Sequence, residues 1–377
     1  MAEAATSGDC PVTRSVDGLK ARLIQAGVTL NEPAPPAPLE TPWSVRVLQA
    51  FSGWLAALFL LGFIAMGVVF VVESPAASLG LGLAMISAAF ALLRTARSDV
   101  LEHLALAVSL AGQLLVAWAA IEFWGGSAYP FWSLLGWSLF GLQAVLALVM
   151  PSYVHRVFSA FAASLALYMA LAMSRGEQTA SGLVLLAVTL VWLNEFRWPH
   201  RIKSVQAWGY GLLMGLLVMQ GLAHSGQPLW FWFEGPISGD SAWMNIWIDR
   251  WIAPGLSAVL LALTLALLLH SIFTHRSPML YRRAALGVAV ILLISVYVPA
   301  VVQGVVLLLL GFAIGHRLLV GLGVFSLLLA IGSYYYWLDT TLLIKALTLI
   351  VIGVMLLSLR WFLRRLDPFD DKREPKP

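Results

Sequence analysis

The sequence predicts an all-α integral membrane protein, a polytopic bundle of about twelve transmembrane helices with both termini in the cytoplasm. Three observations lead to this prediction: the composition, the length of the apolar segments and the placement of the basic residues. Hydrophobic residues make up 60% of the 377-residue chain and charged residues 11%, and the mean hydropathy is +0.86. Because a soluble domain carries about 25% charged residues, this composition excludes a water-soluble enzyme.

The apolar residues fall into twelve continuous blocks of about 15–25 residues, the length that a helix needs to cross hydrocarbon. Continuous runs predict helices, because the strands of a membrane barrel would alternate in polarity. The first six segments are Ala50–Val72, Ala77–Leu93, His103–Phe123, Phe131–Met150, Val154–Met173 and Ala180–Leu193. The second six are Val205–Ala223, Trp251–Phe273, Ala284–Val298, Ala300–Gly315, Leu318–Tyr336 and Thr340–Leu359.

The basic residues fix the predicted orientation. With twelve segments and a cytoplasmic N-terminus, 20 of the 23 Lys and Arg residues fall on the cytoplasmic side. Only Arg175 and Arg250 fall outside, and Lys345 lies within a segment. This bias is the positive-inside pattern of an inner-membrane protein.

Residues Ala284–Gly315 form the one ambiguous segment, because they hold 32 residues without a charge. A single helix of that length would measure about 48 Å, too long for a hydrocarbon core of about 30 Å. Two short spans that turn near Pro299 fit better and keep the basic C-terminal tail inside. A broken re-entrant pair, a geometry found at transporter sites, is the alternative.

Three regions make up the predicted organisation of the chain. Residues 1–46 form a cytoplasmic tail with a short amphipathic helix and a proline-rich linker at Asn31–Pro42. Residues 47–366 form the helical bundle, with a long outer loop at 224–250, and residues 367–377 form a disordered cytoplasmic tail. The first apolar block is expected to be a retained span, because no signal-peptide core precedes it.

No catalytic motif accompanies these segments. The chain lacks a P-loop, an H-E-x-x-H sequence and a C-x-x-C pair, and its single cysteine, Cys10, lies in the polar tail. We therefore expect no cofactor, no metal site and no nucleic-acid partner, and the lack of such motifs favours a non-enzyme over an enzyme.

Lys345 is the main ionisable residue predicted inside a span, and such residues often have a function. It lies about 7–9 Å below the outer interface, so its ammonium group could also snorkel to water. Asp339 lies six residues earlier, about 120° away around the helix, and is poorly placed to pair with it.

Other polar or small residues within the segments are expected to pack helices together. Gln113, Gln143, Gln220 and Gln303 are predicted to bond to one another or to backbone across helices. The pairs Gly211/Gly215 and Gly311/Gly315 are predicted to allow close helix contact.

The dipeptide His–Arg recurs at 155–156, 200–201, 275–276 and 316–317. Cations favour the inner face and helix ends, which explains the recurrence, and a proton-sensing array is the alternative.

The outer loop at 224–250 carries aromatic and acidic residues together. Trp243 and Trp247 predict that it lies on the outer leaflet, because tryptophan prefers the membrane–water boundary. Glu234, Asp240 and Asp249 make a lid or docking surface the functional alternative, since long loops are often functional. The aromatic run Tyr334, Tyr335 and Tyr336 opens on the same predicted side.

The last third of the chain resembles a known family. The run from Gly311 to Arg317, the triplet Gly321–Gly323 and the stretch from Tyr334 to Ala346 closed by Arg360 are similar to the bacterial multi-pass family named domain of unknown function 4401. The resemblance implies a bacterial inner-membrane protein whose partners are another multi-pass protein and a protein with a GDYXXLXY signature. It implies no activity, and it carries Asp339 and Lys345 as family-like features.

Three functions remain open from the sequence. The first is a non-enzymatic component of a membrane complex that docks through the outer loop and the Tyr334–Lys345 region. The second is a transporter or flippase for a neutral or lipid-like substrate that uses the Pro299 break and Lys345. The third is an enzyme that modifies a membrane lipid with Glu234, Asp240 or Asp249.

Overall fold

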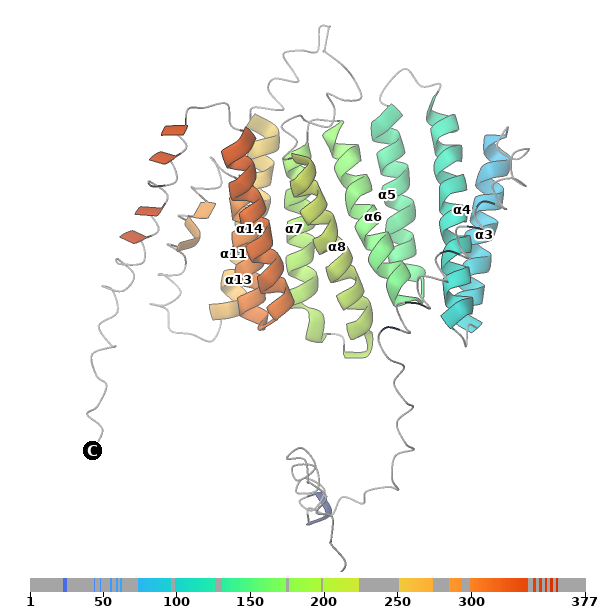
Figure 1. Cartoon of the computed structure of the whole chain (residues 1–377), viewed down its shortest axis with the longest axis horizontal. Helices are drawn as coiled ribbons and strands as arrows, with labels where there is room; N and C mark the ends of the chain where they lie inside the picture. Colours follow the sequence, from blue (N-terminus) through green and yellow to red (C-terminus); the bar gives the residue numbers. More distant parts are fainter. Residues whose placement is uncertain are drawn as a thin grey trace, which may run out of the picture. The chain divides into compact units, whose positions relative to one another are not determined.

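The computed structural model describes residues 74–95, 99–125, 131–173, 176–197, 199–223, 251–273 and 299–337, with scattered positions elsewhere. The chain divides into two units, Met1–Ser52 and Gly53–Pro377. In the first unit, residues 23–25 are helical, and they lie in the N-terminal tail for which the sequence predicts a short amphipathic helix. The long helices that the structure describes all belong to the second unit (Figure 1).

Every described element of the second unit is helical. The helices are α3 (Pro75–Thr95), α4 (Asp99–Gly125), α5 (Phe131–Val149), α6 (Tyr153–Ala172), α7 (Glu177–Leu193), α8 (Ile202–Ala223), α11 (Ala253–Phe273), α13 (Pro299–Ile314) and α14 (Arg317–Trp337). Two short 3-10 helices, η1 (Glu195–Arg197) and η2 (Pro199–Arg201), connect α7 to α8. The all-α prediction is therefore confirmed for the described residues.

Six of these helical segments are long and apolar enough to cross a membrane. They are Pro75–Thr95, Leu101–Gly125, Phe131–Val149, Tyr153–Ala172, Pro199–Leu222 and Ala253–Ile272. Glu177–Leu193, Val301–Ile314 and Arg317–Gly332 are shorter apolar helices. The described helices coincide with nine of the twelve predicted segments, and α13 begins at Pro299, where the sequence predicts a break. The total of twelve spans and their orientation stay predictions.

Helices that follow one another in the chain pack as antiparallel hairpins. The strongest pairs of this kind are α3 with α4, α5 with α6, and α13 with α14 (Figure 1). Glycines allow the close approach: a Cβ on Gly82 would lie 2.7 Å from the carbonyl oxygen of Gly112, and the reverse holds as well. On α13 and α14, Gly311 and Gly323 meet the backbone of the opposite helix in the same way.

Two further helix pairs join elements that are not neighbours in sequence, α6 with α8 and α7 with α11. A Cβ on Gly211 would collide with the carbonyl oxygen of Val157, and one on Gly215 would collide with the hydroxyl of Ser164. The prediction of close helix contact at Gly211 and Gly215 is thus confirmed, with α6 as the partner.

Gly315 has a different role from the one predicted. It takes a left-handed conformation with φ of 71° and has open space around the Cβ position, so it does not bring helices into contact. The amide of His316 donates to the carbonyl of Gly311 at 2.9 Å, and the amide of Gly315 donates to that of Phe312 at 3.3 Å. These two bonds form a Schellman motif, which ends α13 and turns the chain into α14.

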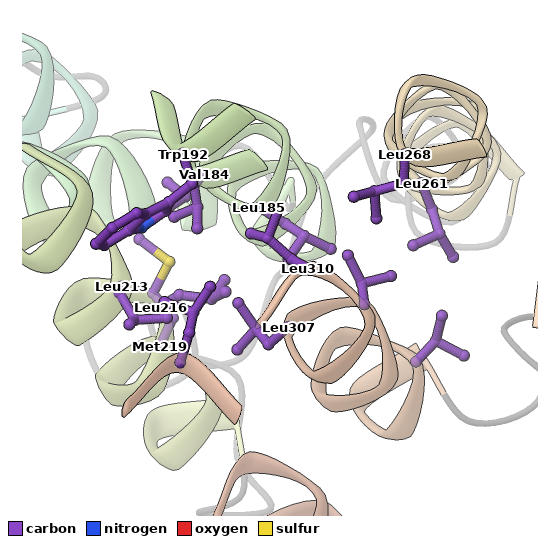
Figure 2. Close-up of a cluster of buried hydrophobic side chains, with 14 of the residues drawn as sticks. Val184, Leu185, Trp192, Leu213, Leu216, Met219, Leu261, Leu268, Leu307 and Leu310 are labelled. Carbon is purple, nitrogen blue, oxygen red and sulfur yellow. The ribbon is translucent and has the colours of Figure 1, made fainter. Parts of the chain in front are cut away.

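The main hydrophobic core lies between α7, α8, α11 and α13 (Figure 2). Its buried side chains include Val184, Leu185, Trp192, Leu213, Leu216, Met219, Leu261, Leu268, Leu307 and Leu310. A smaller core joins Ile86 of α3 to Leu146 and Met150, at the end of α5. The polar cluster described next lies between α4, α5 and α6.

Candidate functional site

Five buried polar side chains from three helices meet between α4, α5 and α6. Ser109 and Gln113 come from α4, Gln143 from α5, and His155 and Ser159 from α6. The exposed fraction of each residue is 8% or less. Within α4 and α6 the pairs are four residues apart, so each pair lies on one face of its helix.

His155 is the centre of this cluster, and both of its ring nitrogens have partners. Ser109 Oγ lies 2.7 Å from His155 Nε2, and Ser159 Oγ lies 3.1 Å from Nδ1. Gln113 Nε2 lies 3.3 Å from His155 Nε2 and donates to Ser109 Oγ at 3.2 Å. Since an amide nitrogen can only donate, Nε2 of His155 is the acceptor, and the ring is neutral with its proton on Nδ1. The Nδ1–H group then donates to Ser159.

Gln143 extends the cluster from α4 to α5. Its Nε2 donates to Gln113 Oε1 at 2.8 Å. Its own Oε1 is buried and has no hydrogen-bond partner among the described residues. The prediction that glutamines of the spans bond across helices is confirmed for Gln113 and Gln143.

The hydroxyl–imidazole contact between Ser109 and His155 invites comparison with a nucleophile and its base. The exposed fractions are 0% for Ser109 and 2% for His155, so a substrate atom has no access to either in this conformation. Hydrogen bonds between transmembrane helices contribute about 0.6 kcal/mol each on average. The arrangement therefore acts to fix the packing and register of α4, α5 and α6.

A polar contact of the same kind joins α4 to the start of α6. Ser152 precedes the first turn of α6, and its hydroxyl donates to Glu102 Oε1 at 2.7 Å. A further contact joins α8 to α5, where Trp208 Nε1 donates to the carbonyl of Ala147 at 2.7 Å. These contacts tie the same ends of α4, α5, α6 and α8 together.

A second buried pair joins α8 to α14. Gln220 Nε2 donates to the carbonyl of Ser326 at 3.0 Å, and the Ser326 hydroxyl donates back to Gln220 Oε1 at 2.5 Å. The predicted bonding of Gln220 to backbone is thus confirmed. Gln303 is half-buried, and the described contacts include no hydrogen bond of its side chain.

His316 caps α14 and also contacts α8. Its Nδ1 accepts from the backbone amide of Leu319 at 3.3 Å, which is the N-cap arrangement. Its Nε2 lies 3.1 Å from the hydroxyl of Tyr210. The ring of Trp192 packs against both rings, with centroids 5.1 Å from Tyr210 and 5.0 Å from His316.

The recurring His–Arg dipeptides do not share one environment. His155 is buried in the polar cluster, His316 is a half-buried helix cap, and His200 is exposed in η2. His275 lies outside the described residues. This variety gives no support to an array of equivalent proton sensors.

The residues singled out from the sequence lie mostly outside the described part of the chain. This holds for Lys345, Asp339, Glu234, Asp240, Asp249, Trp243 and Trp247. Tyr334, Tyr335 and Tyr336 lie in the last turns of α14, where the structure describes the backbone only. Among the described residues there is no group of three His, Cys, Asp or Glu side chains that could hold a metal ion.

Sequence reasoning named two members of the cluster, Gln113 and Gln143, and missed their partners. Ser109 and Ser159 carried no signal of their own, and His155 was considered only as part of a dipeptide. The four-residue spacing of Ser109 with Gln113, and of His155 with Ser159, was the available signal, since each pair forms one polar face on an otherwise apolar helix.

Comparison with known proteins assigns the chain to a family. Residues 42–366 match the family described as Domain of unknown function (DUF4401), and the chain belongs to this family. The match includes every described transmembrane helix. No curated protein and no solved structure shows a significant match to the chain.

Proposed function

We propose that this member of the DUF4401 family is a non-enzymatic component of a protein complex in the bacterial inner membrane. The observation that carries the proposal is the pairing of polar side chains inside the bundle. His155 of α6 contacts Ser109 and Gln113 of α4, and Gln220 of α8 bonds to Ser326 of α14, so these groups hold neighbouring helices together. Because these polar groups serve helix packing, we assign the function to the surface of the bundle and to its connecting segments.

The proposed docking surface is the outer loop at 224–250 together with the region from Tyr334 to Lys345. Both combine aromatic residues with carboxylates, a combination that suits protein contacts, where aromatic side chains dominate binding energy. The proposed partners are a second multi-pass protein and a protein with a GDYXXLXY signature. The resemblance of the C-terminal third to the family supports this choice.

Native purification tests this proposal. The full chain carries a tag at its C-terminus and is extracted from the original host in a mild detergent, and co-eluting proteins are quantified. We expect one partner at near-equal stoichiometry. Trp243→Ala or Tyr335→Ala should release it, while Trp137→Ala, an exposed tryptophan on α5, should keep it. A monodisperse protein that elutes alone would contradict the proposal.

A transporter or flippase for a neutral or lipid-like substrate is the second candidate, and Gln143 favours it. The buried Oε1 of this residue has no partner among the described side chains, so it could accept a hydrogen bond from a polar group passing through the bundle. Flux into proteoliposomes distinguishes the two functions. A carrier should lose flux on Lys345→Met or Gln143→Leu, and a complex component should show no flux above empty vesicles.

A further inference from the structure

Several basic residues lie together in the connection between α7 and α8, at one end of the bundle. Arg197 in η1, His200 and Arg201 in η2, and Lys203 in the first turn of α8 are all exposed. Glu195, the carboxylate at the start of this connection, is buried and accepts a hydrogen bond from Gln206 Nε2 at 2.7 Å. This carboxylate is therefore not exposed alongside the basic side chains.

Arg156 of α6 adds a guanidinium that is held in place by neutral groups. Its Nε donates to the carbonyl of Met150, and its Nη1 donates to the hydroxyl of Ser204 in α8. These acceptors orient the guanidinium without neutralising it. Ser204 lies three residues after Arg201, so this bond brings the Arg156 guanidinium beside the turn that carries Arg201, and the two like charges repel each other. Among the described residues, no carboxylate forms an ion pair with either arginine.

Two guanidinium groups held near each other without a carboxylate form a site for an anion. A phosphate suits them best, because guanidinium groups bind phosphate oxygens through paired hydrogen bonds. Bound phosphate would also remove the repulsion between Arg156 and Arg201.

The surroundings of the two arginines favour a lipid as the source of that phosphate. Arg156 and Arg201 lie at the starts of Tyr153–Ala172 and Pro199–Leu222, two helical segments long and apolar enough to cross a membrane. Headgroups lie at the level of such helix ends. Phe196, with 71% of its surface exposed, stands beside the basic residues, and Val154 and Phe158 of α6 are exposed as well. These apolar side chains offer contact to acyl chains, which a soluble acidic peptide would not need.

We propose that Arg156 and Arg201, together with the exposed basic residues of the α7–α8 connection, bind the headgroup phosphate of an anionic phospholipid. The site is independent of the docking surface proposed above, since it uses α6, η2 and the start of α8. It would anchor one lipid at the junction of α6 and α8, where Gly211 and Gly215 bring the two helices together.

Lipid titration of the purified full chain tests the site. The protein in a nonionic detergent is titrated with phosphatidylglycerol or with phosphatidylcholine of the same acyl chains, and bound lipid is counted by native mass spectrometry. We expect tighter binding of phosphatidylglycerol, and a loss of about five-fold in its affinity on Arg201→Gln. Arg94→Gln is the matched control, because Arg94 is an exposed arginine at the end of α3 whose guanidinium stacks on Phe90 at 4.4 Å.

The variants and competitors make the result decisive. Arg156→Gln should weaken binding as well, and Arg201→Gln keeps the test valid if Arg156→Gln disturbs the α6–α8 contact. Equal binding of the two lipids would overturn the proposal, and so would equal losses in Arg201→Gln and Arg94→Gln, which would indicate a diffuse surface charge. Displacement of the lipid by inorganic phosphate, or preferential binding of poly-glutamate, would assign the arginines to a different anion and equally overturn it.

Discussion

Replacing Gln113 by leucine tests the role of the buried polar cluster directly. The substitution keeps the volume of the side chain roughly constant but removes three hydrogen bonds. These are the two that Gln113 Nε2 makes with Ser109 and His155 and the one that Gln113 Oε1 accepts from Gln143. It also leaves the amide of Gln143 buried with neither of its polar atoms paired among the described residues, because its Oε1 has no partner there before the substitution either.

The expected cost follows from these contacts. The bonds to His155 and Gln143 are interhelical, and two such bonds at about 0.6 kcal/mol each give about 1 kcal/mol, whereas the bond to Ser109 lies within α4. An orphaned buried amide adds about 1–3 kcal/mol. Because such terms are not additive, we expect Gln113→Leu to lower the free energy of unfolding by about 2–4 kcal/mol. The double variant Gln113→Leu/Gln143→Leu should be more stable than the single variant by about 1–2 kcal/mol, since no amide is then left unpaired.

Reversible unfolding in mixed micelles, followed by tryptophan fluorescence, measures these differences. Gln303→Leu on α13 is the matched control, because the described contacts of this half-buried glutamine include no side-chain hydrogen bond; it should change stability by less than about 0.5 kcal/mol. The reasoning is refuted if Gln113→Leu behaves like this control. It is also refuted if the second leucine lowers stability further instead of restoring it.

Three further predictions concern helix contacts and helix ends, each read out as a shift of the midpoint of thermal unfolding in detergent. Gly211→Ala should destabilise the protein by about 1–3 kcal/mol, because the added Cβ meets the α6 backbone. Gly221→Ala has open space around it and should be neutral or slightly stabilising, so equal effects of the two variants would exclude close α6–α8 packing. Gly315→Ala should lower stability by about 1–2 kcal/mol, because Gly315 has a positive φ. Gly321→Ala should not lower stability, and a larger loss in this variant than in Gly315→Ala would contradict the assigned turn. His316→Leu should lose about 1 kcal/mol with the cap of α14, and His316→Asn should recover most of it; no recovery would assign the loss to the aromatic contacts instead.

Much of the helical architecture was predictable because it depends on local properties of the chain. Nine described helices coincide with apolar segments, since a helix satisfies its own backbone groups and the transfer of its side chains into hydrocarbon is nearly additive along the sequence. The start of α13 at Pro299 follows from the same logic, because proline fits the beginning of a helix. Gly211 was recognisable as a contact residue because only small side chains let helix backbones approach.

The site needed the tertiary structure. His155 and Ser109 are 46 residues apart, and Tyr210 and His316 are 106 residues apart, so neither pair is visible in a local pattern. When all faces of a helix are hydrophobic, its sequence gives little indication of which face packs against a neighbouring helix. The sequence therefore did not indicate which face of α4 meets α6.

The sequence by itself determined that this is a helical membrane protein. It also determined where the described helices lie along the chain and which glutamines join them. What only the tertiary structure decided is which helices are neighbours and in what register. The polar partners of His155, the close contact of α6 with α8, and the pairing of Arg156 with Ser204 all depend on that register. The physical reason is that burial in lipid is set residue by residue, whereas helix pairing is set by side-chain packing between distant segments.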